Sequence, residues 1–151
     1  MDKQIYRGVI ISILFVWTGM LLGISFLEAP LKFQAPNITL AIGVTIGRLI
    51  FSTLNKIEIF FSLILLILLF YTDTTKSIFL LFGLVACVLS IQSFWLLPEL
   101  DVRAKIIMSG NVPLEKSPHI LYVAGEVIKL LTIPLMEMKF FLQTINLSAI
   151  A

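Results

Sequence analysis

The amino-acid sequence predicts an all-α integral membrane protein, a four-helix bundle with up-down-up-down topology. Hydrophobic residues make up 59% of the 151 residues and charged residues only 13%, whereas a soluble domain averages about 25% charged residues. The mean hydropathy of +1.05 agrees with this assignment. Because a membrane-spanning helix needs about 20 residues, residues 1–151 suffice for four or five spans in a single transmembrane domain and leave no room for a separate soluble domain.

The first two predicted spans differ in character. The first covers about residues 5–28, and we expect it to end near Glu28 and Pro30. The second covers about residues 39–71. Its most apolar run is short and begins only at Ile57, but the helical pattern begins near Thr39. The first half of this helix is therefore expected to be more polar than the second.

The last two predicted spans begin after polar segments. The third follows the sequence TDTTKS, covers about residues 77–108 and continues through Pro98. The fourth covers about residues 118–142. It begins with Ser117 and Pro118, which suit an N-cap and a first-turn position.

The distribution of charged residues bears on the orientation of the chain in the membrane and on its partners. Cations near the predicted loops divide equally between the two faces: Lys3, Arg7, Lys76 and Lys139 on one, and Lys32, Arg103, Lys105 and Lys116 on the other. Lys3 and Arg7 flank the first span and favour cytoplasmic N- and C-termini. The net charge is only +2 and no basic run is present, so nucleic acid is excluded as a partner and the lipid bilayer is the expected one.

Two predicted helices carry a polar stripe. At about 100° of rotation per residue, the side chains of one stripe point within roughly 80° of one another around the helix axis, and those of the other within roughly 120°. The first comprises His119, Tyr122, Glu126 and Lys129, and the second Arg48, Ser52, Asn55, Glu58 and Ser62. Neither stripe suits contact with lipid, so both are expected to face the bundle interior. Glu28, Asp101 and Arg103 are expected at the same membrane face, so that all four helices contribute to one site.

One explanation of these charges is structural. Ionisable groups at membrane depth cost about 2.5–3.5 kcal/mol each on insertion scales, so they persist when they are paired, solvated or functional. Three pairs have the i,i+4 spacing of helical ion pairs: Glu28 with Lys32, Glu99 with Arg103, and Asp101 with Lys105. Arg48 and Lys129 would then pair with Glu58 and Glu126 across helices, and no ligand would be needed.

The functional explanation is a metal or ligand site. Carboxylate and imidazole ligands suit zinc, iron or manganese, and the candidate ligands are Glu58, His119, Glu126, Glu28 and Asp101. The set departs from carboxylate-bridged di-metal bundles, which carry Glu-x-x-His on two helices, because this chain has one histidine. The supporting polar residues are Arg48, Asn55, Arg103, Tyr122 and Lys129, with the cations positioning carboxylates or an anionic group.

Two glycine pairs match GxxxG, a spacing that allows close approach of helices. They are Gly19 with Gly23 and Gly43 with Gly47. We expect them to serve packing within the bundle, with homo-oligomer contact as the alternative.

Four strings carry a family resemblance. EAPLKF (28–33), IGRLIFSTLNKIE (46–58), LPELDVRA (97–104) and HILYVAGEVIK (119–129) together resemble the small four-helix membrane proteins that include transmembrane protein 205. The domain that defines that group has no established function, so the resemblance implies a four-span bundle but no mechanism. A weaker similarity, to small four-span oxygenase-like proteins of polyketide pathways, would favour an enzyme.

The sequence therefore yields one principal hypothesis and two alternatives. The principal one is a polar site near one membrane face that binds a divalent metal ion or a small polar ligand, and a metal-dependent membrane enzyme is one form of it. The first alternative is an oligomeric small transporter or proton pathway that uses the same buried charges. The second is the structural ion-pair network alone.

Overall fold

The computed structural model describes residues 3–113 and 117–148, with side chains described as far as residue 145. Lys116, one of the cations counted above, lies outside the described residues. Every regular element in this part is a helix, which confirms the all-α expectation. The elements are α1 (Lys3–Met20), η1 (Leu21–Glu28), α2 (Ala29–Leu31), η2 (Lys32–Gln34), α3 (Leu40–Phe70), α4 (Lys76–Ile91), η3 (Gln92–Leu96), α5 (Leu97–Met108) and α6 (His119–Ser148).

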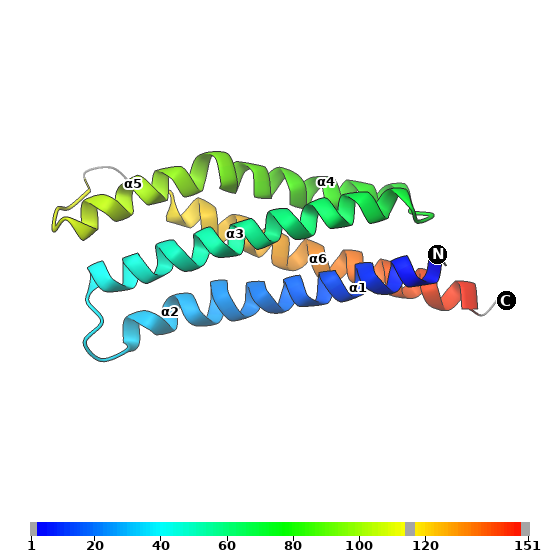
Figure 1. The fold of residues 1–151 in the computed structure, drawn as a ribbon, viewed down its shortest axis with the longest axis horizontal. Helices are drawn as coiled ribbons and strands as arrows, with labels where there is room; N and C mark the ends of the chain where they lie inside the picture. The colour runs from blue at the N-terminus through cyan, green and yellow to red at the C-terminus, as the bar shows by residue number, and fades with distance from the viewer. Residues whose placement is uncertain (1–2, 114–116, 149–151) are drawn as a thin grey trace.

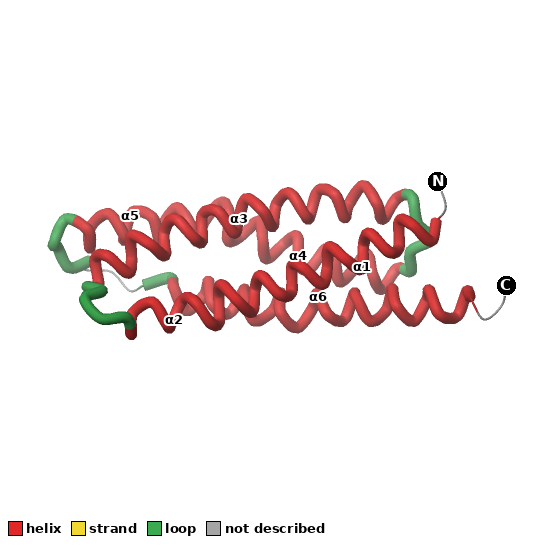
Figure 2. Tube along the Cα trace, turned by 60° about the horizontal axis from the view of Figure 1, so that its bottom comes forward, coloured by secondary structure: helices red, strands yellow, loops and turns green. Residues whose placement is uncertain are grey.

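These elements form four long helical segments that lie side by side (Figure 1). The segments Lys3–Gln34, Leu40–Phe70, Lys76–Met108 and His119–Ile145 are each long and apolar enough to cross a membrane. Helix α6 packs against α1 and α4, while α3 packs against α1 and α5. Short connections join the segments at the two ends of the molecule (Figure 2).

Two π-helical stretches, η1 and η3, interrupt the first and third segments, and each ends two residues before a proline. Ala29 donates its N–H to the carbonyl of Ile24, and Leu97 donates to that of Gln92, both five residues back. The prolines that follow, Pro30 and Pro98, lack an N–H and crowd the preceding turn, which accounts for the wider turn. The first segment thus continues past Glu28 to Gln34 instead of ending near Pro30 as expected.

Local capping sets two helix ends. The Thr39 hydroxyl accepts a hydrogen bond of 3.3 Å from the N–H of Ile42 and caps α3. After α5, Gly110 has a φ of +81°, and the N–H groups of Gly110 and Asn111 bond to carbonyls in the last helical turn. This is a Schellman motif, in which glycine avoids the strain of a left-handed backbone.

The packed apolar core fills the half of the bundle where α1 begins and α6 ends. Its residues come from all four segments: Ile10, Leu14, Trp17, Leu21, Leu65, Leu69, Ile78, Phe82, Val85, Leu89, Ile133, Met136 and Phe140. At this end the Lys3 ammonium lies 2.6 Å from the Asp73 carboxylate and holds the pKa of Asp73 below its usual value by donating a hydrogen bond. The contact ties the start of α1 to the turn between α3 and α4.

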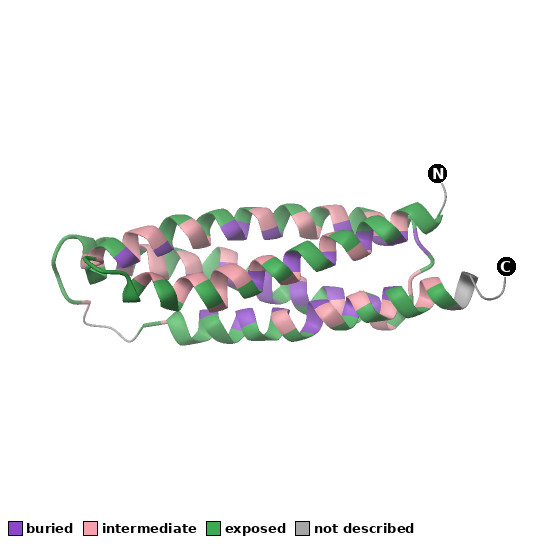
Figure 3. Ribbon diagram, turned by 90° about the horizontal axis from the view of Figure 1, so that it is seen from below, coloured by how far each residue is buried: buried purple, intermediate pink, exposed green. Residues whose placement is uncertain are grey.

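Large apolar side chains also cover the outer faces of the helices, where exposed positions predominate (Figure 3). Phe94 is 86% exposed, Leu80 75% and Phe70 74%. Such exposure is far beyond the isolated apolar patches of a water-soluble monomer.

Candidate functional site

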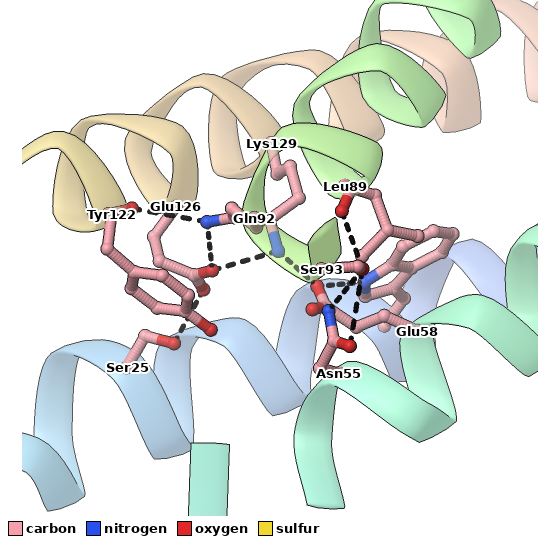
Figure 4. Close-up of polar contacts among 10 residues, drawn as sticks. Ser25, Asn55, Glu58, Leu89, Gln92, Ser93, Tyr122, Glu126 and Lys129 are labelled. Atoms are coloured by element: carbon pink, nitrogen blue, oxygen red, sulfur yellow. Dashed lines mark hydrogen bonds and ion pairs between the residues drawn. The ribbon is translucent and has the colours of Figure 1, made fainter. Parts of the chain in front are cut away.

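A buried triad of charged side chains lies between α3 and α6. The Lys129 ammonium is 2.5 Å from Glu58 Oε1 and 2.8 Å from Glu126 Oε1. All three residues are at most 1% exposed. Figure 4 shows the lysine side chain placed between the two carboxylates. The Glu58–Lys129–Glu126 triad is thus formed by residues from both predicted polar stripes.

Neutral donors from the first and third segments add three hydrogen bonds to the triad. Trp17 Nε1 donates to Glu58 Oε1 at 2.9 Å, and Gln92 Nε2 donates to Glu126 Oε1 at 2.9 Å. The Ser25 hydroxyl donates to Glu126 Oε2 at 2.6 Å. Ser25 lies on η1 and Gln92 on η3, so both π-helical stretches supply a donor to the triad. All four helical segments therefore meet at these two carboxylates.

The triad has more acceptors and negative charge than its partners satisfy. With both carboxylates ionised and the lysine protonated, its formal charge is −1. Glu58 Oε2 is buried and, among the described residues, has no hydrogen-bond partner. The Tyr122 hydroxyl beside Glu126 is likewise buried without a hydrogen bond in the described part of the chain. A single buried ammonium group therefore contacts two carboxylates and neutralises only one of their two charges.

A cavity of about 1030 Å³ occupies the other half of the bundle, next to the triad. Its lining follows α3 from Leu40 to Lys56, a length of roughly 24 Å at 1.5 Å per helical residue. Seven predicted site residues line it: Arg48, Asn55, Asp101, Arg103, His119, Tyr122 and Glu126. The other three, Glu28, Glu58 and Lys129, do not, although Lys129 and Glu58 connect to it through Glu126.

Ion pairs strengthen the cavity wall. Arg48 donates through Nε to Asp101 on α5, and Lys105 lies 2.7 Å from the same carboxylate. The predicted pair of Glu28 and Lys32 is present at 3.2 Å. Of the pairs expected across helices, Lys129 with Glu58 is present, but Arg48 pairs with Asp101 and not with a glutamate of another helix. Ten residues separate Arg48 from Glu58 along α3, about 15 Å, so Lys129 and not Arg48 can contact Glu58.

The five candidate metal ligands do not converge. Among the described residues, no group of three or more His, Cys, Asp or Glu side chains is placed to hold a metal ion. His119 is exposed at the first residue of α6. Glu28 and Asp101 are each paired with a lysine or arginine. Only Glu58 and Glu126 come together, and the Lys129 ammonium lies between them where an ion would have to bind.

Sequence reasoning missed three residues that shape the site. Gln92 and Ser93 are adjacent polar residues in the largely apolar third segment, and Ser93 accepts a 2.9 Å hydrogen bond from Asn55. Gly125 allows η3 to approach α6, because a Cβ there would stand 2.8 Å from Gln92 Nε2. The usable signals were the polar pair itself and a glycine directly before Glu126.

The two glycine pairs have different surroundings. Side chains of the same chain fill the space beside one pair, with the Phe33 ring against Gly43 and the Lys32 side chain against Gly47. Among the described residues, no atom apart from the neighbouring residues and the helix's own backbone lies within 4 Å of where a Cβ would stand at Gly19 or Gly23. Packing within the chain therefore explains Gly43 and Gly47. For Gly19 and Gly23, contact with another copy stays a prediction.

Comparison with known proteins finds no family model, no curated protein and no solved structure that matches this chain.

Proposed function

We propose that the chain is an integral membrane protein that crosses the bilayer four times with up-down-up-down topology and cytoplasmic termini. Four segments long and apolar enough to span a bilayer support this. The exposed phenylalanine and leucine side chains on their outer faces support it too, because lipid is the solvent they suit. Lys3 and Arg7 at the first span favour the orientation.

We further propose that this protein binds a small ligand in the cavity beside the triad. The supporting observation is that seven of the ten residues singled out from the sequence line one cavity of about 1030 Å³. Ligand sites are concave, largely apolar and furnished with a few polar groups, and they range over about 300–1,000 Å³. The cavity has this composition, with Tyr122 and Glu126 at the end next to the triad.

The arrangement favours a bound ligand over the other hypotheses. A metal ion has little support, because the carboxylates that meet are already bridged by Lys129. A path through the bundle has less support than a site confined to one end of it, because the packed apolar core lies beyond the triad. A purely structural ion-pair network accounts for Glu58, Lys129 and Glu126, but it does not account for a cavity lined by further charged residues.

Filling the cavity tests this proposal. Native mass spectrometry of the protein purified in a mild detergent is expected to show a bound small molecule on the parent chain. Ser52→Trp places an indole in the cavity lining and should abolish this adduct. Phe60→Trp, on an exposed face of the same helix, should retain it. An adduct of equal occupancy on the Ser52→Trp variant, or none on the parent, would contradict the proposal.

A further inference from the structure

We propose that the cavity ligand is an anionic amphiphile, with its phosphate or carboxylate head between Lys32 and Arg48 and its apolar part against Phe33 and Phe51. This inference rests on the proposed ligand-binding function and names the chemical class of the ligand.

The charged side chains that line the cavity are the first support for an anionic ligand. Four cations, Lys32, Arg48, Lys56 and Arg103, face two carboxylates, Asp101 and Glu126. One of these carboxylates, that of Glu126, already bonds to Lys129 behind the wall. Two helices also begin at the cavity, α3 at Leu40 and α6 at His119, and helix N-termini carry partial positive charge. Within the lining itself, cationic side chains therefore outnumber carboxylates by four to two, although Lys32 is paired with Glu28 and the triad behind the wall has a formal charge of −1.

The positions of two of these cations, Arg48 and Lys32, are the second support. Asp101 uses the Nε of Arg48, one of five N–H donors on a guanidinium group, so Arg48 keeps donors for a second anion. The Lys32 ammonium is 3.2 Å from Glu28 and lies 5.2 Å from the centroid of the Phe51 ring. Its side chain is only 8% exposed. An anion there would meet one cation that is largely removed from water, Lys32, and a second, Arg48, that is 40% exposed and held in place by Asp101. Hydrogen bonds between such charged groups are stronger than neutral ones.

The length of the cavity and its apolar lining residues indicate that the ligand also has an apolar part. The lining extends roughly 24 Å along α3, far longer than a single inorganic anion needs. The Phe26, Phe33, Phe51 and Leu97 side chains provide apolar surface between the charged groups. The buried Tyr122 hydroxyl, which has no hydrogen bond in the described part of the chain, is available to a polar atom of the ligand. A molecule with both a charged head and an apolar body matches these walls.

The test compares three probes by native mass-spectrometric titration of the full chain in detergent. The probes are oleoyl lysophosphatidate, oleoyl lysophosphatidylcholine and glycerol 3-phosphate. The first should bind about tenfold more tightly than either of the others. Lysophosphatidylcholine keeps its phosphate only as a diester and adds a choline cation, and glycerol 3-phosphate lacks the apolar body. Glycerol 3-phosphate represents a soluble source of the same head group.

Charge variants locate the binding. Arg48→Gln combined with Lys56→Gln should weaken oleoyl lysophosphatidate binding about tenfold, and Asp101 keeps Lys105 as its partner in this variant. Lys76→Gln, an exposed lysine at the start of α4, removes a cation at the other end and should leave binding unchanged.

Three outcomes would overturn the inference. The two lysolipids could bind with equal affinity, glycerol 3-phosphate could bind as tightly as oleoyl lysophosphatidate, or Lys76→Gln could weaken binding as much as the Arg48→Gln, Lys56→Gln variant. If the lysolipids bind equally but Ser52→Trp still abolishes their binding, the ligand class is wrong and the ligand-binding function stands. If Ser52→Trp leaves all binding intact, both proposals fail.

Discussion

Replacement of Lys129 by methionine is expected to destabilise the protein by about 3–5 kcal/mol, the range for removing one partner of a buried ion pair. The ammonium is fully buried and contacts both Glu58 and Glu126. The variant would leave two buried carboxylates with a formal charge of −2 and only neutral donors. Unfolding in mixed micelles with increasing sodium dodecyl sulfate should therefore show a large loss of stability.

The matched variants follow from the same charge count. Glu126→Gln brings the triad from −1 to 0, and an amide oxygen can still accept from Gln92 and Lys129, so we expect little change in stability. Glu58→Gln gives the same neutral charge and should behave likewise. Lys139→Met, a lysine elsewhere in α6, controls for loss of a lysine as such. If Lys129→Met were as stable as the parent, the two carboxylates would not depend on the ammonium for neutralisation.

Combining the changes separates charge from packing. The triple variant Glu58→Gln, Glu126→Gln, Lys129→Met carries no formal charge in the triad, and buried ion pairs can often be replaced without loss of stability. It should recover most of the stability that Lys129→Met loses. Failure to recover it would show that the hydrogen bonds from Trp17, Ser25 and Gln92, and not charge balance, hold these helices together.

The sequence predicted the helices well because their signals are local. Long apolar runs marked all four segments, and Thr39 and Gly110 lie at ends set by ordinary capping chemistry. The helical stretch of Leu21–Gln34 was harder to predict. Pro30 suggested an end, but a π-helical turn before it lets the helix continue. Pro30 lies just beyond Leu21–Glu28 and crowds the preceding turn, which widens without ending the helix.

Helical periodicity also predicted which faces carry polar residues, but not how they pair. It placed Glu58, Glu126 and Lys129 in the interior, where the structure has them. It could not fix how α3 and α5 lie relative to one another, and that arrangement places Asp101, and not a glutamate of another helix, beside Arg48. Pairing across helices depends on crossing geometry, which single-helix periodicity does not contain.

Replacement of Trp17 by alanine is the second large effect that we expect, a loss of about 3–5 kcal/mol, typical of deleting a large aromatic side chain from a core. Trp17 is 1% exposed and its ring packs 6.0 Å from that of Phe61, measured between centroids. It also donates to Glu58, so the variant combines a cavity with a lost hydrogen bond to a buried carboxylate. Unfolding in the same mixed micelles measures the loss.

Two further substitutions separate these contributions. Trp17→Phe keeps much of the ring volume but removes the donor, so it should lose about 1–3 kcal/mol, the cost of leaving a buried acceptor unsatisfied. Trp95→Ala, at a residue 55% exposed, should change stability little, because its ring lies outside the core. Trp17 belongs to the apolar core and does not line the cavity. The folded fraction of Trp17→Phe should therefore bind oleoyl lysophosphatidate as tightly as the parent, and weaker binding would show that the core and the cavity are coupled through Glu58.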